Sequence, residues 1–327
     1  METILGVDIG GAKCTVVIGA MNDKQKLHIF DKLSFPTELD KGCDHALTLI
    51  FTAIRTLLEA DQIDTKDVAA IGISCCGPLD SKTGMILSPP NLPGWDEVPI
   101  VELFEKRFGI RTYLQNDANA CALAEWKYGA ARNKENAIFL TFSTGMGAGM
   151  ILNGKLYAGK NDMAGEIGHV RMVRLGPVGY GKAGSFEGFC SESGLISLAR
   201  GKALEKLQMG EKVSYCKDLS QVSKITTKKL KKAALAGDTL ALEVYGICGR
   251  YMGYAISALI DVLNPEVIVL GGIYGDAQTF IEPEMRKVIE KETLRQSLEV
   301  CSIVSAELGD NLGCYAALSV ATSQMSL

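Results

Sequence analysis

The chain has 327 residues, of which 47% are hydrophobic and 22% charged, and its formal net charge is −4. This composition is typical of a globular enzyme with two ordinary domains or one large α/β unit, and it excludes a disordered chain. The negative balance offers no general basic field for nucleic acid, and no apolar run approaches the roughly 20 residues that span a bilayer. The first residues lack the basic region of a secretory signal, and the ten cysteines include no C-x-x-C pair. We therefore expect reduced thiols and a cytoplasmic location, without membrane or nucleic-acid partners.

An internal repetition organises the chain. Residues 4–20 (ILGVDIGGAKCTVVIGA) and residues 137–154 (AIFLTFSTGMGAGMILNG) each combine an apolar strand, a glycine-rich turn and a second apolar strand. Neither turn opens into a helix, so each segment predicts a β-hairpin. Two such units, roughly 134 residues apart, indicate a duplicated α/β domain.

Helical and strand patterns alternate around these hairpins. In the first half, helices are expected at 44–60, 98–108 and 118–130, and strands at 68–74 and 112–115. In the second half, helices are expected at 189–208, 226–236, 238–261, 279–292 and 311–324, and a buried strand at 266–270. This alternation predicts α/β architecture. The lysine run at 228–232 is expected to be a solvated helix face.

The first hairpin turn, Asp8-Ile9-Gly10-Gly11-Ala12-Lys13, has the composition of a phosphate-binding turn. Adjacent glycines let backbone N–H groups approach an anion closely, and an acid beside them suits Mg²⁺ or a metal-bound water. Taken alone, the turn favours the simpler interpretation of a tight hairpin that carries a solvated aspartate.

A second glycine-rich turn covers residues 143–149 (STGMGAG) and adds hydroxyl groups around Thr144 and Gly145. A third glycine pair, Gly271-Gly272, follows the buried strand, at the strand end where α/β sheets receive ligands. The turn at 143–149 leads into a strand and not a helix, which argues against a dinucleotide-binding fingerprint.

Two polar motifs remain. Asn116-Asp117 is either a helix N-cap or the site of a general base, and one pair of residues can serve both purposes. A carboxylate at a helix N-terminus is a weak base, which phosphoryl transfer tolerates because positioning and charge stabilisation do most of the work. The stretch from Gly165 to His169 places Glu166 and His169 three residues apart, either as surface decoration or as contacts to sugar hydroxyls.

Together these motifs resemble the ROK family of sugar kinases and regulators, within the actin-like and hexokinase-like ATPase superfamily. The resemblance covers nearly the whole chain. It is carried by Asp8-x-Gly10-Gly11 with Thr15, residues 72–80 (GISCCGPLD), residues 91–95 (NLPGW), residues 116–119 (NDAN), Thr144-Gly145-x-Gly147, Gly165-Glu166-x-Gly168-His169 and Gly271-Gly272.

The resemblance implies an α/β fold of two actin-like ATPase (ribonuclease H-like) domains around a central cleft. The expected domains are residues 1–116 and 117–307, with a helix at about 308–327 returning to the first domain. The resemblance also implies a role for each matching residue. Asp117 would take the proton from the sugar hydroxyl. The sugar would be held by Asn91, Asn116, Glu166, His169 and Glu187. The nucleotide would be held by Asp8, Gly10, Gly11, Lys13, Thr144, Gly145, Gly271 and Gly272.

This sequence departs from the family pattern in three places. Many relatives follow Gly-Glu-x-Gly-His with C-x-C-G-x-x-G-C, which forms a structural zinc site with the histidine. The matching positions here are Gly179, Gly181 and Ser185, so we expect no zinc and no other protein-held metal. Ser74-Cys75-Cys76 alters a loop that would border the sugar, and Ser143 replaces a glycine before Thr144.

The implied function is transfer of the γ-phosphate of ATP, with Mg²⁺, to a hexose or hexose derivative. Glucose and its 6-hydroxyl are the first choice, and a homodimer is expected from the family. The sequence does not name the sugar, the hydroxyl or any regulation. A catalytically inactive sugar sensor is the main alternative, and ATP turnover would distinguish the two. A DNA-binding regulator would carry a further domain before the first hairpin, which begins at Ile4. A non-kinase actin-like ATPase would leave the sugar-facing side chains without a purpose.

Overall fold

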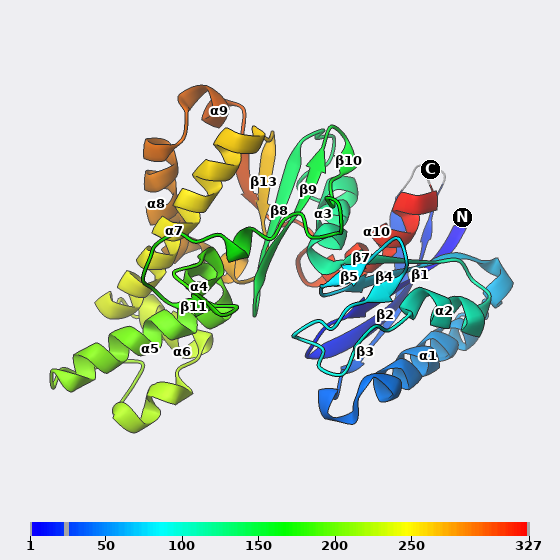
Figure 1. The fold of residues 1–327 in the computed structure, drawn as a ribbon, viewed down its shortest axis with the longest axis horizontal. Helices are drawn as coiled ribbons and strands as arrows, with labels where there is room; N and C mark the ends of the chain where they lie inside the picture. Colours follow the sequence, from blue (N-terminus) through cyan, green and yellow to red (C-terminus); the bar gives the residue numbers. More distant parts are fainter. Residues whose placement is uncertain (1, 23–25, 326–327) are drawn as a thin grey trace. The chain divides into compact units, whose positions relative to one another are not determined.

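The computed structural model describes residues 2–22 and 26–325, which form a mixed α/β fold with two five-stranded sheets (Figure 1). The chain divides into two compact units. The first comprises Met1–Phe139, Gly149–Ala164 and Ala306–Leu327, and the second Leu140–Ala148 and Gly165–Ser305. The α/β class predicted from the alternating pattern is thereby confirmed. No described helix combines the length and apolarity that a membrane crossing requires.

The first sheet has the strand order β3-β2-β1-β4-β7. Its strands are β1 (Glu2–Ile9), β2 (Lys13–Met21), β3 (Leu27–Pro36), β4 (Val68–Cys75) and β7 (Thr112–Asn116). β1 and β2 form the predicted hairpin, while β1, β4 and β7 run parallel. The register pairs Asp8 with Ser74, and Cys75 with Asn116. The carboxyl ends of three parallel strands therefore meet at one edge of the sheet.

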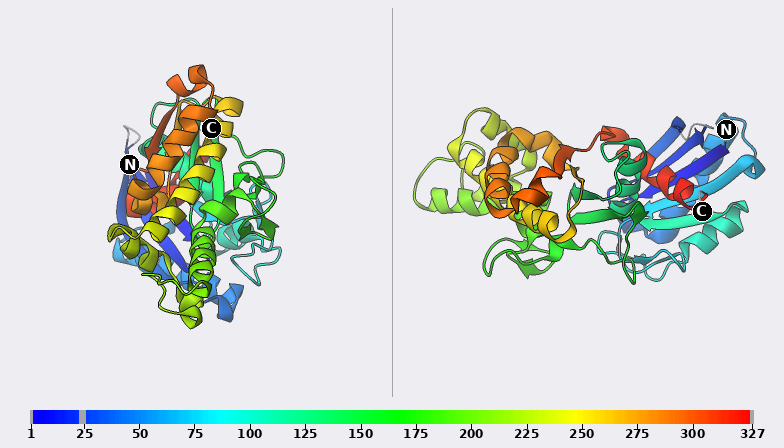
Figure 2. Two further views of the ribbon diagram at one scale, coloured as in Figure 1. Left: turned by 90° about the vertical axis from the view of Figure 1, so that its left-hand side faces the viewer. Right: turned by 90° about the horizontal axis from the view of Figure 1, so that it is seen from above.

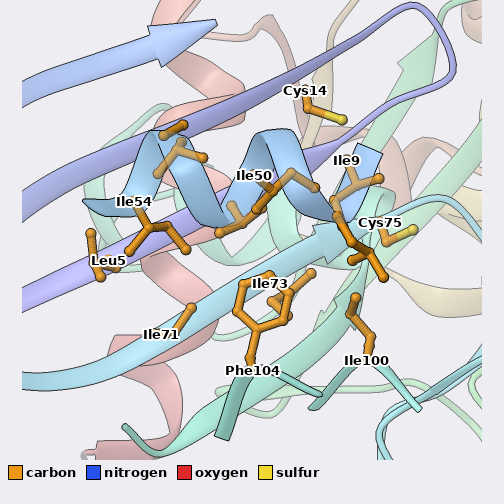
Figure 3. Packing of buried hydrophobic residues seen from close by; sticks show 14 of the residues in the cluster. Leu5, Ile9, Cys14, Ile50, Ile54, Ile71, Ile73, Cys75, Ile100 and Phe104 are labelled. Atoms are coloured by element: carbon orange, nitrogen blue, oxygen red, sulfur yellow. The ribbon is translucent and has the colours of Figure 1, made fainter. Parts of the chain in front are cut away.

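One face of this sheet is covered by α1 (Cys43–Ala60) and α2 (Ile100–Phe108). Apolar residues of α1 recur at helical spacing, so Ile50 and Ile54 both point at the strands (Figure 3). They pack in one buried cluster with Ile73 and Phe104. Helix α2 ends at Phe108, and the Gly109 that follows has a φ of 69°, the left-handed conformation that glycine adopts readily.

The other face carries α3 (Asp117–Tyr128) and α10 (Leu312–Met325). In Figure 2 the red α10 lies against the blue strands, and its Leu318 and Ala321 share a buried cluster with Ile4. The helix approaches β4 so closely that a Cβ on Gly72 would lie 2.1 Å from the carbonyl oxygen of Ala317. The helix predicted over 311–324 is confirmed. A short hairpin, β5 (Leu79–Asp80) and β6 (Met85–Ile86), follows β4.

The second sheet has the strand order β10-β9-β8-β13-β14. Its strands are β8 (Ala137–Phe142), β9 (Met146–Leu152), β10 (Lys155–Leu156), β13 (Val267–Leu270) and β14 (Ser302–Ser305). The helices of this part are α4 (Phe186–Cys190), α5 (Glu192–Gln208), α6 (Thr227–Leu235), α7 (Thr239–Leu263), α8 (Ile273–Glu292) and α9 (Arg295–Glu299). A small hairpin joins β11 (Val178–Gly179) and β12 (Lys182–Ala183).

Several elements differ from the sequence prediction. The helix expected at 279–292 begins earlier, at Ile273, and the helix expected at 189–208 is two helices separated at Ser191. Strands β3 and β14 were not predicted. The domain boundary expected after residue 116 falls inside the first unit, because α3 packs on α10 through Ala120, Ala124 and Val320.

Candidate functional site

Asp8 lies at the carboxyl end of β1, beside the glycine turn that separates β1 from β2. Its carboxyl group forms a hydrogen bond with the Ser74 side chain, its partner in the strand register. Burial raises the pKa of Asp8, while the Ser74 hydrogen bond and the nearby Lys13 charge lower it. Ser74 thus helps to keep a buried carboxylate ionised.

The Gly10-Gly11 turn is closed by short contacts on both sides. The Gly10 N–H donates to the Lys13 carbonyl at 3.1 Å, and Thr37 Oγ1 donates to the Gly10 carbonyl at 2.6 Å. A Cβ on Gly11 would lie 2.7 Å from the carbonyl oxygen of Asn91. The structure therefore brings Asn91 against the turn, next to the strand end that carries Asp8.

Asn116 and Asp117 begin α3. Asn116 is the N-cap, and its Oδ1 accepts from the Ala118 N–H at 3.0 Å. Asp117 is the first helical residue. Burial raises the pKa of the Cys121 thiol, one turn further along, and the charges of Asp117 and Asp8 raise it too. Both carboxylates therefore lie in one neighbourhood of the first unit.

A second group of polar residues lies in the second unit, at Glu166, His169 and Glu187. Glu166 immediately precedes the short helix η3 (Ile167–His169), and Glu187 is in the first turn of α4. Burial raises the pKa of Glu166, the Glu187 charge raises it further, and His169 lowers it. Burial also raises the pKa of Glu187, while its hydrogen bond from Met146 and the His169 charge lower it. The three side chains are thus close enough to influence one another's charge.

The Thr144-Gly145 turn lies against this group. The Met146 N–H donates to Glu187 Oε2 at 3.1 Å, and a Cβ on Gly145 would lie 3.2 Å from the same oxygen. Ser193 Oγ donates to the Thr144 carbonyl at 2.9 Å. A side chain at Gly145 would therefore make a tight contact with the Glu187 carboxylate, which would have to shift by a few tenths of an ångström.

Gly271 and Gly272 follow β13 and open α8 directly. The Gly271 N–H donates to the Leu140 carbonyl at 2.9 Å. Gly272 has a φ of 67°, and a Cβ there would lie 1.9 Å from the Phe142 carbonyl oxygen. A strand that leads through two glycines into a helix N-terminus can bind an anionic or polar ligand with free backbone N–H groups. Because the sequence prediction began this helix six residues late, it missed this helix N-terminus.

Two further residues near Asp8 were missed as functional candidates. Ser74 was noticed only as part of an altered loop, although its hydroxyl contacts the Asp8 carboxyl group. Gly313 lies in the first turn of α10, and a Cβ there would lie 2.7 Å from Asp8 Oδ2. No local pattern reveals either contact, because each joins segments far apart in the sequence.

The hairpin that would hold zinc in many relatives has a different local structure. Ser185 Oγ accepts from the Gly188 N–H at 3.1 Å and donates to the Gly179 carbonyl at 3.4 Å. Gly181 adopts a φ of 74° in the hairpin turn. In the part of the chain that the structure describes, no three His, Cys, Asp or Glu side chains are grouped to hold a metal. The residues present do not fit a zinc site.

The two sheets, with glycine turns at their strand ends, define the class of the protein as an actin-like ATPase fold. Within that class, the chain belongs to the ROK family, which it matches over residues 4–324.

Three known proteins show the range of this similarity. The chain is 30% identical to a glucokinase from Halalkalibacterium halodurans, covering 94% of this chain and 92% of that one. A ROK family glucokinase from Streptomyces griseus, solved with glucose and AMPPNP, is 27% identical with a TM-score of 0.77, covering 98% of this chain and 99% of that chain. The DNA-binding transcriptional dual regulator NagC from Escherichia coli is 27% identical, covering 93% of this chain and 71% of the regulator.

Proposed function

We propose that this chain is an ATP-dependent sugar kinase that transfers the γ-phosphate of ATP to a hydroxyl of a hexose or hexose derivative. The observation that carries the proposal is that Asp8 and Asp117 lie at the carboxyl ends of two parallel strands of one sheet, β1 and β7, and both influence the Cys121 thiol, with a glycine turn directly after β1. The similarity to a glucokinase that binds glucose and AMPPNP supports both substrates. Glucose is the first choice of sugar, with the 6-hydroxyl as acceptor.

In this proposal Asp117 is the general base. Its carboxylate orients the sugar hydroxyl and accepts its proton as the oxygen attacks the γ-phosphorus. The position at the start of α3 places helix N–H groups behind the carboxylate, which weakens it as a base. Phosphoryl transfer tolerates a weak base because the hydroxyl proton leaves late and positioning contributes most of the rate.

Five polar side chains would hold the sugar. Asn91 and Asn116 offer amide groups, while Glu166, His169 and Glu187 offer carboxylate and imidazole groups that suit hydroxyls. The raised pKa values of Glu166 and Glu187 reflect partial burial, which strengthens hydrogen bonds to a ligand. Discrimination between sugars would come from these few polar side chains.

The nucleotide would be held mainly by backbone. The N–H groups of Gly11 and of the Thr144-Gly145 turn would face phosphate oxygens. Gly10, which has no side chain, would leave room for the phosphates, with Lys13 nearby and Gly271-Gly272 close to the nucleoside. Asp8 fits Mg²⁺, because Mg²⁺ is commonly held by one or two carboxylates together with substrate phosphates. When bound, that ion would neutralise charge that develops on the phosphates.

A panel of sugars tests this function. We expect ADP release from ATP·Mg²⁺ with one or a few of glucose, N-acetylglucosamine, N-acetylmannosamine, mannose, fructose, allose and β-glucosides. Phosphorus NMR of the product would identify the phosphorylated hydroxyl. The 6-hydroxyl assignment is wrong if the 6-deoxy form of the preferred sugar is still phosphorylated.

The second candidate is a catalytically inactive sugar sensor, which the similarity to the regulator NagC favours. In that case sugar binding would be measurable by calorimetry while no sugar in the panel stimulated ADP release. A cytoplasmic homodimer is proposed for either function, and light scattering in solution would measure the subunit number.

A further inference from the structure

A large pocket lies in the first unit, and none of the residues proposed for catalysis lines it. Its volume is 1210 Å³. The walls come from β7 and α3, from the loop at 129–135, from the β9–β10 hairpin with its following loop, from α10, from the β5–β6 hairpin and from Met21 of β2. The proposed phosphoryl transfer uses neither this pocket nor its side chains.

The charge of the pocket is opposite to that of the whole chain. Five basic side chains and two acidic ones line it, an excess of three positive charges in a protein of net charge −4. The basic residues are Lys82, Lys127, Arg132, Lys134 and Lys155, and the acidic ones are Glu135 and Asp162. A concave surface with this excess attracts anions, because its walls concentrate the field.

Lys127 is the basic residue of the pocket whose charge is least compensated by its neighbours. It is half-buried on α3, and its Nζ reaches Thr322 Oγ1 only at 3.4 Å. Among the residues that the structure describes, no carboxylate lies within 4.0 Å of it, whereas Arg132 pairs with Glu307 at 3.0 Å. Burial lowers the pKa of Lys127 to about 8. An anion in the pocket would compensate a charge that is costly to bury alone.

Aromatic side chains form much of the remaining wall. They are Tyr113, Trp126, Tyr128 and Tyr157. Trp126 is held in place because its Nε1 donates to the Lys134 carbonyl at 2.6 Å. Fixed aromatic faces suit the apolar face of a sugar or a nucleobase ring. The volume exceeds what a lone inorganic anion needs and accommodates a ring together with its charged group.

We propose that this pocket is a second ligand site that binds a ring-bearing organic phosphate. The phosphate lies at Lys127, and the ring lies against the aromatic wall. A phosphate monoester fits better than a single carboxylate, since it offers more acceptor oxygens and more charge to several lysine donors. A sugar phosphate and a nucleoside monophosphate share this chemistry.

Titration of the whole protein with glucose 6-phosphate and, separately, with AMP tests the site. Saturating glucose and AMPPNP are present, so that the proposed active site does not compete for the probes. Trp126 is one of only two tryptophans, and the other, Trp95, is 1% exposed and does not line the pocket. Binding is therefore expected to change tryptophan fluorescence, and calorimetry measures Kd independently. Trp126→Phe should abolish the optical signal.

Lys127→Met is the decisive variant, and Lys106→Met is its matched control. Lys106 is an exposed lysine on α2 that does not line the pocket. We expect Lys127→Met to raise Kd at least tenfold for the probe that binds, and Lys106→Met to leave it unchanged. Circular dichroism checks that the variant is folded. Replacement of this half-buried lysine by methionine should preserve the fold.

The probe that binds more tightly identifies the natural ligand as a sugar phosphate or a nucleotide. The proposal is overturned if neither probe binds at millimolar concentration. It is also overturned if Lys127→Met and Lys106→Met bind the probe with the same Kd. Neither titration involves phosphoryl transfer, so failure here and failure of the kinase assay are separate results.

Discussion

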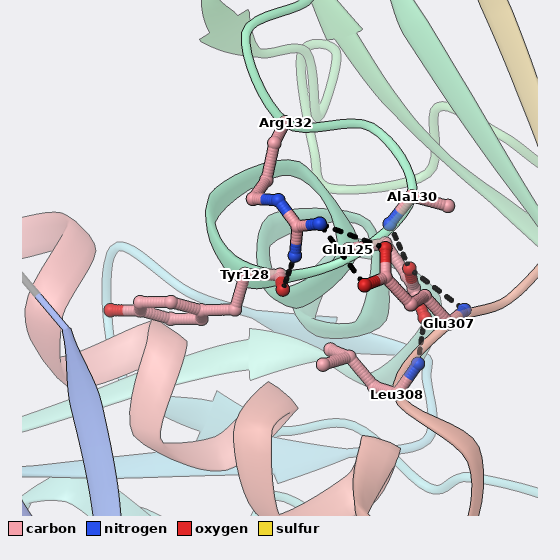
Figure 4. Close-up of polar contacts among 6 residues, drawn as sticks. All are labelled: Glu125, Tyr128, Ala130, Arg132, Glu307 and Leu308. Atoms are coloured by element: carbon pink, nitrogen blue, oxygen red, sulfur yellow. Dashed lines mark hydrogen bonds and ion pairs between the residues drawn. The ribbon is translucent and has the colours of Figure 1, made fainter.

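Glu125 on α3 is completely buried and holds three backbone N–H groups (Figure 4). Its Oε2 accepts from Ala130 at 2.7 Å and from Glu307 at 3.3 Å, and its Oε1 accepts from Leu308 at 3.0 Å. The bonds from Glu307 and Leu308 tie α3 to the segment that leads into α10, and the bond from Ala130 holds the loop that follows α3. We therefore predict that Glu125→Ala destabilises the first unit.

The magnitude follows from the three donors. Each buried N–H that loses its acceptor costs about 1 kcal/mol or more, so the loss should be about 3 kcal/mol. That is a large part of a typical stability of roughly 5–15 kcal/mol. Urea unfolding followed by circular dichroism measures it. Glu125→Gln, which keeps one acceptor oxygen, should lose less than the alanine variant.

Glu102→Ala is the matched control for this experiment. Glu102 is an exposed glutamate on α2 that pairs with Lys106, so its removal should cost less than about 0.5 kcal/mol. If Glu125→Ala loses no more free energy of unfolding than Glu102→Ala, the three hydrogen bonds of Glu125 do not stabilise the first unit, and the reasoning is refuted.

Three other changes give distinct results. Ser74→Ala removes the hydrogen bond that lowers the pKa of Asp8, so that pKa should rise. The acidic limb of the pH profile of kcat/KM should therefore move to higher pH in Ser74→Ala, because ionised Asp8 is lost at a higher pH. A profile that matches the wild type would contradict this. Gly72→Ala should lower Tm by several degrees because its Cβ would meet the Ala317 carbonyl at 2.1 Å, and an unchanged melt would show that α10 can shift. Incubation with EDTA should leave Tm unchanged because Ser185 holds its hairpin by hydrogen bonds, and a chelator-dependent drop would reveal a structural metal.

Much of the fold could be predicted because its signals are local. The hairpins at residues 4–20 and 137–154 combine apolar strands with glycine turns, and the structure has β1–β2 and β8–β9 there. Helices α1 and α7 carry apolar residues at helical spacing, and both lie where the pattern placed them.

The elements that were missed lack such a signal. β3 and β14 are edge strands, and in β3 only Leu27 is buried, so hydrophobic alternation is weak. The start of α8 was missed because its first turn follows two glycines, which read as a loop. The packing that requires glycine at residue 72 comes from Ala317 on α10. Patterns of hydrophobic residues within a short stretch of sequence cannot reveal a contact between segments so far apart in the chain.

The same distinction applies to the candidate site. A helix cap at Asn116 or Asp117 was predicted from residue type and position, and the structure has Asn116 as the cap. The contact between Ser74 and Asp8 depends on the register of β1 against β4, which the sequence does not specify residue by residue. The roles of Asp117, Glu166 and the other proposed contacts remain predictions for experiment.

The most direct test of the proposed kinase is turnover by Asp117→Asn with the sugar that the panel identifies. This variant keeps the shape of the side chain but cannot accept the proton. We predict that kcat falls by about 10²–10⁴, the usual contribution of a general base, while calorimetry shows that sugar binding is retained. Near-normal turnover by a correctly folded Asp117→Asn variant would contradict the assignment of Asp117 as the base.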